Sequence, residues 1–446
     1  MKILLTVHQF FPDFKAGTEV LTLSVARELI KRGNSVRILT GYPSLAGLAD
    51  HQRLDEYCLE DGLHVYRFNH AYEPMGEQSS LIEINYNNQL SAIYFEHILE
   101  EFSPDIVHFF HLERLGTALI ERTVRAGVPC FMTSTDFWSI CPMGQMLLSN
   151  NALCPGPSYN AGNCLKHFAE STQGNVISKI GASLPVVVAD SLVWMTAKGF
   201  LPSYPKRAEV KALSNRLPTV VSRMNMLSGI VVPNKFLKQS LVKYGINSDL
   251  IDIRAFGIDF PRSGLRKTRS LDTRSLRVGF IGTLAPHKGC DVLVKAFLKF
   301  SEPGARLKIY GSPFDFPDYF ETLRFLAHDD SRIQFCGTFP NSEIGEVFEG
   351  LDVLVVPSIW YENNPLVVYS ANSSGCPVIA SNLPGLSEVV RDGVDGLLFD
   401  SGSSEALAEI FSRLVHQDGL LERLSEAILP PKSISVYVDE LEAIWR

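Results

Sequence analysis

The stretch Pro357-Ser358-Ile359-Trp360-Tyr361-Glu362-Asn363-Asn364-Pro365-Leu366 joins an apolar segment to the predicted start of a helix. The apolar run at 353–356 predicts a fully buried strand, and Pro365 suits the first turn of a helix because its missing N–H would be unpaired there. Asn364 is then the expected N-cap residue. A helix that opens at the carboxyl end of a parallel strand presents free N–H groups to an anion, and the carboxylate of Glu362 can accept hydrogen bonds from hydroxyl groups. The stretch therefore suits a diphosphate beside a polyol.

The composition is that of an ordinary globular chain with room for two domains. Its 446 residues are 46% hydrophobic and 20% charged. The net charge of -8 argues against general nucleic-acid binding. The apolar run at 3–7 is too short for the core of a signal peptide, and no apolar stretch approaches the roughly 20 residues that cross a bilayer. We therefore expect a cytoplasmic protein with at most peripheral contact with the inner face of the membrane, and eight mostly reduced cysteines.

Short apolar segments alternate with amphipathic segments in both halves, which is typical of doubly wound parallel sheets. The predicted strands of a first sheet lie at 3–7, 36–40, 106–110, 129–133 and 229–232, and those of a second at 278–281, 307–310, 333–335, 352–356 and 378–380. A less periodic region at about 139–225 interrupts the first set, and the polar residues 263–275 form a predicted exposed connection. We expect an α/β protein with one domain at 1–245, a second at 246–430, and a cleft lined by the loops at the strand ends.

Three further segments lie where such loops would be. The loop Gly282-Thr283-Leu284-Ala285-Pro286-His287-Lys288-Gly289 has glycines that let the backbone approach a ligand, and Lys288 offers a charge for phosphate. An isolated loop of this kind can equally hold one solvated lysine. Ala16-Gly17-Thr18-Glu19 has the same position in the first half, although a single glycine is more often only a turn. Of two histidines near a strand end, we expect His108 to pack within the sheet, while His111 at the rim is a candidate for ligand contact.

Taken in this order, these segments resemble the retaining GT-B glycosyltransferases that are glycosyltransferase family 4-like, also called glycosyl transferases group 1. The resemblance spans nearly the whole chain and includes the segments 105–111, 256–259, 375–380 and 388–396. It implies the GT-B fold, in which two doubly wound Rossmann-like domains face a cleft and a C-terminal helix, here within 431–446, returns to the first domain. It also implies retaining transfer of a hexose-like sugar from a UDP- or GDP-sugar to a hydroxyl of a glycan or lipid-linked saccharide, with no cofactor required for catalysis.

By the same resemblance, Lys288 would hold the donor diphosphate and Glu362 would bind sugar hydroxyls. Phe339 and Asn341 would lie near the nucleobase, and Asp136 and Trp138 would lie on the acceptor side. The implied catalytic residues are Glu362, Lys288 and His111. The implied donor site comprises Gly17, Gly282, Thr283, Lys288, Phe339, Asn341, Glu362, Asn363, Asn364, Leu366 and Ser370.

The chain departs from the family pattern at three positions. Ser370 stands where the second glutamate of an E-x7-E motif would hold the ribose, Thr135 replaces the histidine of a His-Asp pair, and Thr283 stands where relatives carry an arginine. One lost charged hydrogen bond weakens binding by about 1.5 to 3 kcal/mol, roughly ten- to hundredfold. Ser370 and Thr135 favour an alternative in which the chain is a catalytically silent homologue that binds a nucleotide sugar or a partner, whereas the retained Lys288 and Glu362 favour the enzyme. A second alternative, a sugar-nucleotide epimerase, would need a general acid and base at the sugar carbon.

The interrupting region contains a possible metal-binding pattern. Cys141, Cys154, Cys164 and His167 could supply a tetrahedral structural zinc site, with Cys164 and His167 as the closest pair. The alternative is three unpaired thiols packed as small hydrophobic groups. The segment also resembles a subgroup of the family in which a Cys-Pro after Asp136-Phe137-Trp138 begins a cysteine-rich insertion.

Overall fold

The computed structural model describes the chain except residues 45, 172–182, 260–274 and 329. It divides into two compact units, which we call unit 1 and unit 2. Unit 1 comprises Met1–Ser149, Cys154–Gly257 and Ile434–Arg446, and unit 2 comprises Asn150–Leu153 and Ile258–Ser433. Unit 1 extends past the boundary predicted at 245 because the strand at Ile251–Ile253 pairs with the sheet of this unit. The predicted connection 263–275 lies, apart from Ser275, outside the described residues.

Unit 1 is built on one eight-stranded sheet. The strands are β1 (Lys2–Val7), β2 (Ser35–Tyr42), β3 (Leu54–Cys58), β4 (His64–Asn69), β5 (Ile106–Phe109), β6 (Cys130–Thr133), β7 (Gly229–Val232) and β8 (Ile251–Ile253), and their order is β3-β4-β2-β1-β5-β6-β7-β8. All neighbours are parallel except the β3 and β4 pair. The chain starts in the centre at β1, builds toward one edge, and then returns to β5 on the other side of β1. The order therefore reverses between β1 and β5, which makes this pair the topological switch point of the sheet.

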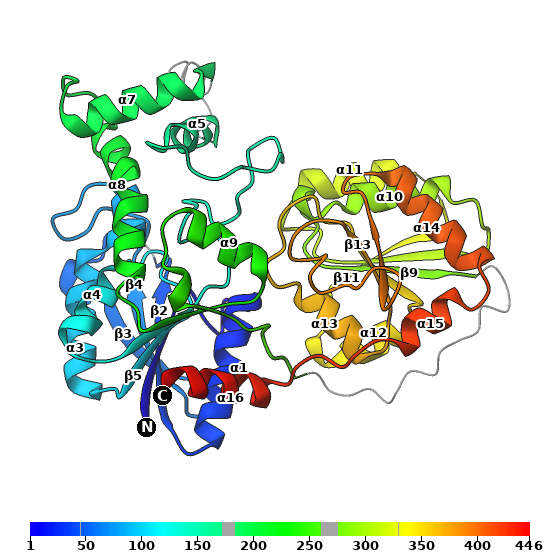
Figure 1. The fold of residues 1–446 in the computed structure, drawn as a ribbon, viewed down its shortest axis with the longest axis horizontal. Coiled ribbons are helices and arrows are strands. Elements are labelled where there is room, and N and C mark those ends of the chain that lie inside the picture. Colours follow the sequence, from blue (N-terminus) through cyan, green and yellow to red (C-terminus); the bar gives the residue numbers. More distant parts are fainter. Residues whose placement is uncertain (45, 172–182, 260–274, 329) are drawn as a thin grey trace. The chain divides into compact units, whose positions relative to one another are not determined.

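The helices of unit 1 cover this sheet and form its insertion. They are α1 (Gly17–Lys31), α2 (Leu81–Asn87), α3 (Gln89–Phe102), α4 (Ala118–Arg125), α5 (Gly162–Ser171), α7 (Val186–Lys198), α8 (Arg207–Met224), α9 (Lys235–Lys243) and α16 (Ile434–Trp445), with short 3-10 turns at Asp50–Gln52 and Ser248–Leu250. Figure 1 shows α5 and α7 packed at one end of α8. These three helices belong to the region that the sequence shows as an interruption.

The C-terminal helix α16 completes the core of unit 1, as the family resemblance implied. It lies beside α1 in Figure 1, and Tyr437, Val438 and Leu441 are fully buried. The indole N–H of Trp445 donates to Nδ1 of His108 at 3.1 Å, and Nε2 of His108 lies 2.8 Å from the hydroxyl of Thr133. The last residues of the chain are therefore hydrogen-bonded to the centre of the first sheet.

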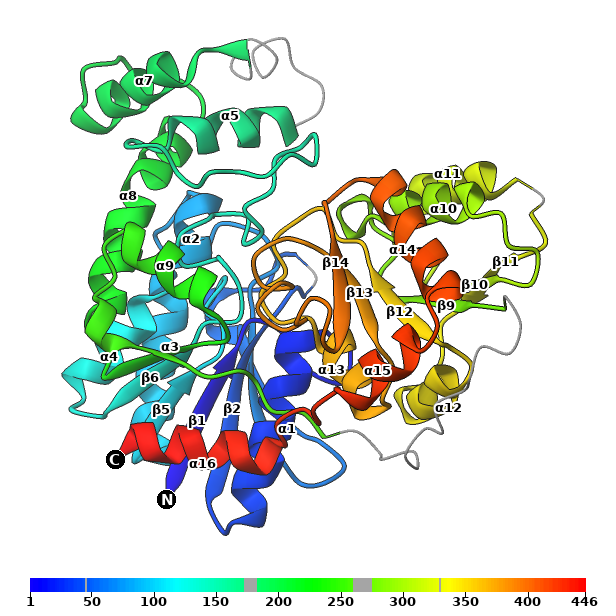
Figure 2. The same cartoon turned by 45° about the vertical axis from the view of Figure 1, so that its right-hand side comes forward.

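Unit 2 is a six-stranded parallel sheet. The strands are β9 (Arg277–Ile281), β10 (Arg306–Tyr310), β11 (Ile333–Gly337), β12 (Val353–Val356), β13 (Val378–Ser381) and β14 (Gly396–Phe399), in the order β11-β10-β9-β12-β13-β14. Figure 2 shows β9, β12, β13 and β14 side by side. The chain again reverses direction across the sheet after its first strand, so the switch point lies between β9 and β12.

Helices on both faces bury the sheet of unit 2. They are α10 (Cys290–Lys299), α11 (Pro317–Ala327), α12 (Ile344–Glu349), α13 (Leu366–Ser373), α14 (Ser404–His416) and α15 (Leu420–Glu426), with 3-10 turns at Pro286–Lys288 and Asn341–Glu343. One core contains β9 and β10 side chains with α10 and α14, and the other contains β12 and β13 side chains with α12 and α13. The uninterrupted apolar run of β12 follows from this burial on both faces. Among the described residues, no helix is long and apolar enough to cross a membrane.

The buried imidazole of His108 makes the stability of unit 1 depend on pH. Burial lowers the pKa of His108 to about 3, whereas an unfolded chain has a value near 6.5. Below about pH 6.5 the unfolded state therefore binds a proton that the folded state does not, and stability falls as the pH falls. From pH 6.5 to pH 5 this loss amounts to about 2 kcal/mol.

We predict that the stability penalty of His108→Asn, measured by urea unfolding, is smaller at pH 5 than at pH 7 by about 2 kcal/mol. The variant no longer carries the group whose protonation favours the unfolded state. Tyr437→Phe is the control, because it removes a hydroxyl from the same hydrogen-bonded group without a titration in this range. An equal His108→Asn penalty at both pH values would contradict the prediction.

Candidate functional site

Two loops meet at the switch point of unit 2, one after β9 and one after β12. The backbone N–H of Ile359 donates to the carbonyl of His287 at 2.9 Å. Gly289 has a φ of +69°, and a Cβ atom there would lie 2.0 Å from the carbonyl oxygen of Pro357. Only a glycine permits this approach. The loop at 282–289 and the stretch at 357–366 are therefore in direct backbone contact.

The centre of this site is an ion pair between Lys288 and Glu362. Nζ of Lys288 donates to Oε1 of Glu362 at 2.7 Å, and the same oxygen accepts from Oγ of Ser358 at 2.7 Å and from Nε1 of Trp360 at 2.9 Å. Glu362 is 8% exposed. Burial alone would raise the pKa of this carboxyl, but the charge of Lys288 and the three hydrogen bonds lower it below its ordinary value. Glu362 is therefore held as a carboxylate.

Trp360 and His287 complete the surroundings of Lys288. The ammonium group lies 4.8 Å from the centre of the Trp360 ring, and the His287 ring meets the same indole edge-on at 4.6 Å. Burial and then the charge of Lys288 lower the pKa of His287 to about 4, so its imidazole is neutral at pH 7. Sequence reasoning did not assign roles to Ser358, Trp360 or His287, although all three lie in the two segments that it singled out.

The start of α13 differs from the prediction. The helix begins at Leu366, and Pro365 is its N-cap residue, because the backbone of Pro365 (φ -75°, ψ 85°) is still outside the helical region. The predicted N-cap role of Asn364 is therefore wrong, and Oδ1 of Asn364 is buried without a hydrogen-bond partner in the described part of the chain. Ser370 is 3% exposed and donates its hydroxyl to the carbonyl of Leu366 at 3.0 Å. Its one proton is thus used within its own helix.

The other residues expected at the donor site lie on neighbouring loops of the same unit, with one exception. Gly282 and the exposed Thr283 follow β9, and the N–H of Gly282 donates to the carbonyl of Tyr310 at 3.0 Å. Phe339, half-buried, meets Tyr310 edge-on at 5.3 Å, and the exposed Asn341 opens the next turn. Asn363 and Leu366 are half-buried in the segment after β12. The exception is Gly17, which is the first residue of α1 in unit 1.

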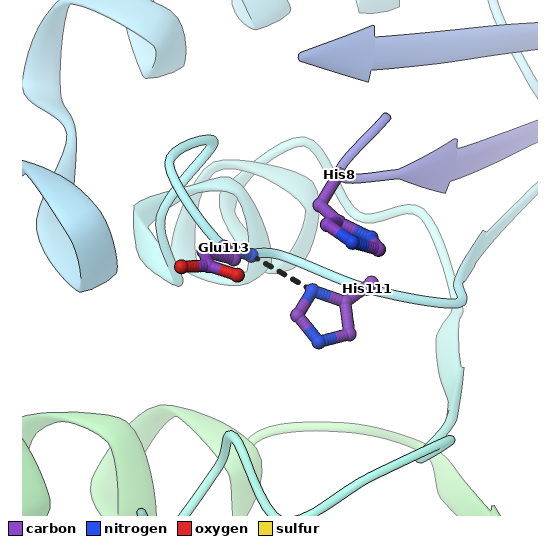
Figure 3. A group of neighbouring side chains, drawn as sticks. All are labelled: His8, His111 and Glu113. Carbon is purple, nitrogen blue, oxygen red and sulfur yellow. Dashed lines mark hydrogen bonds between the residues drawn. The ribbon is translucent and has the colours of Figure 1, made fainter. Parts of the chain in front are cut away.

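A second group of polar residues lies at the switch point of unit 1. His8 follows β1 and His111 follows β5, and their ring centres are 4.1 Å apart. Figure 3 shows both rings beside Glu113, whose backbone N–H donates to Nδ1 of His111 at 3.2 Å. Nε2 of His111 lies 3.1 Å from Oδ2 of Asp136. Burial would lower the pKa of His111, but the Asp136 carboxylate raises it above its ordinary value. In the neutral form its proton lies on Nε2.

Glu19 adds a buried carboxyl group to these residues. It is 0% exposed, and neither of its oxygens has a hydrogen bond of good geometry within the described residues, although Gln9 and the backbone at Ala16 and Glu19 are near enough to lower its pKa. Nε2 of His8 is 3.6 Å away, and Nδ1 of His8 is also buried and unpartnered. Burial raises the pKa of Glu19 and lowers that of His8 well below its ordinary value. Buried polar atoms without partners are costly, so this group suits a ligand that carries hydroxyls.

The side chains of His8, His111 and Glu113 also meet a geometric requirement for metal binding. One potential ligand atom from each lies within 4.8 Å of the other two. Both nitrogens of His111, however, already have protein partners, at Asp136 and at the backbone of Glu113. A metal ion would have to displace one of them. Binding a ligand hydroxyl requires no such change, so these residues suit hydroxyl recognition better than metal binding.

The predicted acceptor-side residues have different positions. The side chain of Asp136 is 38% exposed, and its Oδ1 accepts from the backbone N–H of Trp138 at 2.8 Å. Trp138 is only 1% exposed, and its indole N–H donates to Asn85 at 3.1 Å. Its ring is part of the interior, so Trp138 positions Asp136 and does not itself face an acceptor. Thr135, at the position of the expected histidine, accepts a hydrogen bond from Thr18 at 3.0 Å.

The four candidate metal ligands of the insertion come together in the fold. Cys141, Cys154, Cys164 and His167 line one small pocket of unit 1. The three cysteines are buried, and each is a free thiol. The loop between Cys141 and Cys154 turns back on itself, since the N–H of Cys154 donates to the carbonyl of Met146 at 2.8 Å.

Comparison with known proteins agrees with this architecture. The profile of the family "Glycosyl transferases group 1" matches residues 262–428. A D-inositol 3-phosphate glycosyltransferase of Corynebacterium glutamicum (strain R) is 32% identical over 183 residues, which is 40% of this chain and 44% of that protein. The corresponding enzyme of Rhodococcus opacus (strain B4) is 31% identical over 196 residues, or 41% of this chain and 44% of that protein. The matched region thus spans less than half the length of these relatives.

Solved structures cover nearly the whole chain. Anabaena HepE in complex with UDP-glucose superposes with a TM-score of 0.62 at 16% identity, covering 99% of both chains. Sucrose-phosphate synthase from Thermosynechococcus elongatus has a TM-score of 0.63 at 15% identity, covering 100% of this chain and 98% of that one. At this identity the likeness establishes the fold alone. The match to the glycosyl transferases group 1 profile is confined to residues 262–428, and the chain has the GT-B fold that the resemblance predicted.

We predict that Gly289→Ala lowers the free energy of unfolding of unit 2 by about 2 to 5 kcal/mol. A left-handed backbone costs a non-glycine residue about 1 to 2 kcal/mol, and the clash with Pro357 adds an overpacking cost of about 1 to 3 kcal/mol. Gly402→Ala is the matched control, because its φ is +80° but a Cβ atom there has nothing within 4 Å. For Gly402→Ala, urea unfolding should show only the cost of the left-handed backbone, about 1 to 2 kcal/mol. Equal effects of both variants would mean that the two loops are not in contact.

Proposed function

We propose that this protein is a glycosyltransferase that moves a hexose-like sugar, with retention, from a UDP- or GDP-sugar to a hydroxyl of a glycan or lipid-linked saccharide. The observation that carries the proposal is the Lys288–Glu362 pair at the switch point of unit 2. Ligands of open α/β sheets bind outside the carboxyl ends of the strands at such a point. The named relatives are glycosyltransferases, and HepE was solved with UDP-glucose, which supports this choice of donor.

The two charged groups have distinct roles in the proposed donor site. The side chain of Lys288 is 25% exposed, so its ammonium can donate to a diphosphate oxygen while it stays near Glu362. The N-terminus of α13 follows directly and adds partial positive charge. Oε1 of Glu362 already accepts three hydrogen bonds, which makes it a poor nucleophile. Glu362 therefore binds sugar hydroxyls, and Lys288 stabilises the negative charge of the departing diphosphate.

We assign acceptor recognition to the polar group at the switch point of unit 1. The unpartnered atoms of Glu19 and His8 can each bond a hydroxyl, and His111 is oriented by Asp136. The proposal includes no metal at the diphosphate, since Lys288 and the helix N-terminus supply the positive charge. The internal hydrogen bond of Ser370 is the reason to expect weak binding of the ribose.

The first test compares nucleoside diphosphates with nucleotide sugars by isothermal titration. We predict that Lys288→Ala weakens the binding of UDP (or GDP) and of the corresponding nucleotide sugar by roughly ten- to hundredfold. The substitution removes a charged hydrogen bond to the diphosphate that both ligands share. Lys295→Ala is the control, since this exposed lysine pairs with Asp291 on α10. Unchanged affinity for every donor in Lys288→Ala would place the donor site elsewhere.

A second prediction separates sugar binding from diphosphate binding. Glu362→Gln should weaken the binding of the nucleotide sugar roughly tenfold or more, while the free nucleoside diphosphate should bind at least as tightly as to the wild type. The substitution removes an acceptor for sugar hydroxyls and frees Lys288 from its partner. If both ligands weaken equally, Glu362 acts only by positioning Lys288.

Turnover decides between the enzyme and the silent homologue. Any nucleotide sugar that binds is incubated with a panel of glycans and lipid-linked saccharides, and the anomeric configuration of a product is read by NMR. A product with the donor's configuration supports the proposal. Tight binding without transfer or hydrolysis across the panel would favour the silent homologue.

A further inference from the structure

Four potential metal ligands from separate segments of unit 1 line one pocket of about 10 Å³. Cys141 follows the turn after Trp138, Cys154 lies in the loop before α5, and Cys164 and His167 are on α5 itself. On a helix, residues three apart lie on the same face, so Cys164 and His167 present their side chains together. A volume of this size holds one water-sized particle or one ion.

Each segment is held in place by contacts of its own. The backbone N–H of Cys141 donates to the carbonyl of Phe137 at 2.7 Å, and Gly144 closes the turn by donating to the carbonyl of Cys141 at 3.0 Å. The carbonyl of Pro155, next to Cys154, accepts from Nζ of Lys243 at 3.1 Å and from the hydroxyl of Tyr244 at 3.2 Å. The start of α5 is anchored at Asp190, which accepts from the N–H of Gly162 at 2.8 Å. These contacts hold the three segments near one another, although the ligand atoms must still move closer together to bind an ion.

A buried arginine, Arg216, lines a neighbouring pocket of about 340 Å³ that shares Pro142, Met143 and Phe168 with the first pocket. Arg216 is 2% exposed and donates from Nη2 to the carbonyl of Trp138, but Nε and Nη1 have no hydrogen-bond partner among the described residues. Its charge interacts with the sulfurs of Cys141 and Cys164. Glu113 and the Trp138 ring, whose centre is 5.2 Å from the guanidinium carbon, also favour this buried charge, and further negative charge nearby would stabilise it. Thiols do not supply that negative charge, whereas metal-bound thiolates do.

We propose that unit 1 binds one Zn²⁺ through the sulfurs of Cys141, Cys154 and Cys164 and an imidazole nitrogen of His167. Three thiolates and one neutral imidazole around Zn²⁺ carry a net charge of -1 (2 - 3), which balances Arg216. Four protein ligands make a closed, structural site. No three of these ligand atoms yet lie within 4.8 Å of one another, so binding draws the two Cys-Pro loops and α5 inward.

Such a site would stabilise the turn that carries Asp136. Cys141 is bonded through its backbone to Phe137, and the N–H of Trp138 in the same turn donates to Asp136. Metal binding at Cys141 therefore restrains the carboxylate that orients His111. The proposal does not rest on the glycosyltransferase activity, because each readout below measures metal or stability.

The experiment measures the metal content of freshly purified full-length protein by elemental analysis. We expect about one zinc per chain in the wild type, less than about a tenth of that in Cys164→Ser, and wild-type content in Cys130→Ser, a buried cysteine of β6 away from the pocket. His167→Cys should retain the metal, because Cys₄ sites also bind zinc tightly, while His167→Ala should lose most of it. Protein without zinc, even after refolding with zinc sulfate, would overturn the proposal.

Two further measurements guard against variants that fail to fold. In the wild type, a mercurial that titrates thiols should release zinc in step with the modification of three cysteines, and a chelator should lower the melting temperature by several degrees. Zinc that persists in Cys164→Ser but is lost in Glu113→Gln would place it at His8 and His111 and overturn the assignment. Iron with acid-labile sulfide and visible absorption would also overturn it.

Discussion

The carboxylate of Glu362 is a buried charge, and the strand ends of unit 2 are arranged to keep it ionised. Its three donors come from Lys288, Ser358 and Trp360, and Lys288 reaches it only because the loop after β9 touches the loop after β12. That contact in turn requires Gly289 beside Pro357. The parallel strand order, the glycine and the ion pair therefore depend on one another. A substitution at any one of them changes the position of the positive charge that a diphosphate would meet.

Each unit has a buried glutamate at the switch point of its sheet, but the two glutamates differ in their hydrogen bonding. Glu362 has three hydrogen-bond donors, one of which is Lys288, whereas Glu19 is fully buried and neither of its oxygens has a hydrogen bond of good geometry among the described residues. A satisfied carboxylate is an acceptor of fixed charge and position. A buried carboxyl group without hydrogen bonds is unfavourable because it has lost its water, and a ligand hydroxyl can supply the missing hydrogen bond. This contrast agrees with the proposal of a donor site that is organised in advance and an acceptor site that is completed by its ligand.

Sequence reasoning worked where local pattern and burial agree. The strands buried on both faces, such as β7 and β12, are unbroken apolar runs and were predicted almost to the residue. The strands β3 and β4 were missed because they lie at the edge of the sheet, where apolar side chains alternate with polar ones. The N-cap of α13 was misplaced because a proline can precede a helix as well as begin it. The burial of Trp138 depends on tertiary packing, which no local pattern reports.

The insertion of unit 1 has a physical reason to need a cross-link. Helices α5 and α7 pack on one another and on α8, whereas α8 also packs on α2 and α4, and the exposed side chains of this region include Trp194 and Phe200. One small core cluster, with Cys164 and Leu213 among its few buried members, packs the insertion against Ile82 of α2. An ion that ties α5 to the turn at Cys141 would connect this region to the residues that hold Asp136 and His111. The rigidity of the candidate acceptor site would then depend on the insertion as well as on the sheet beneath it.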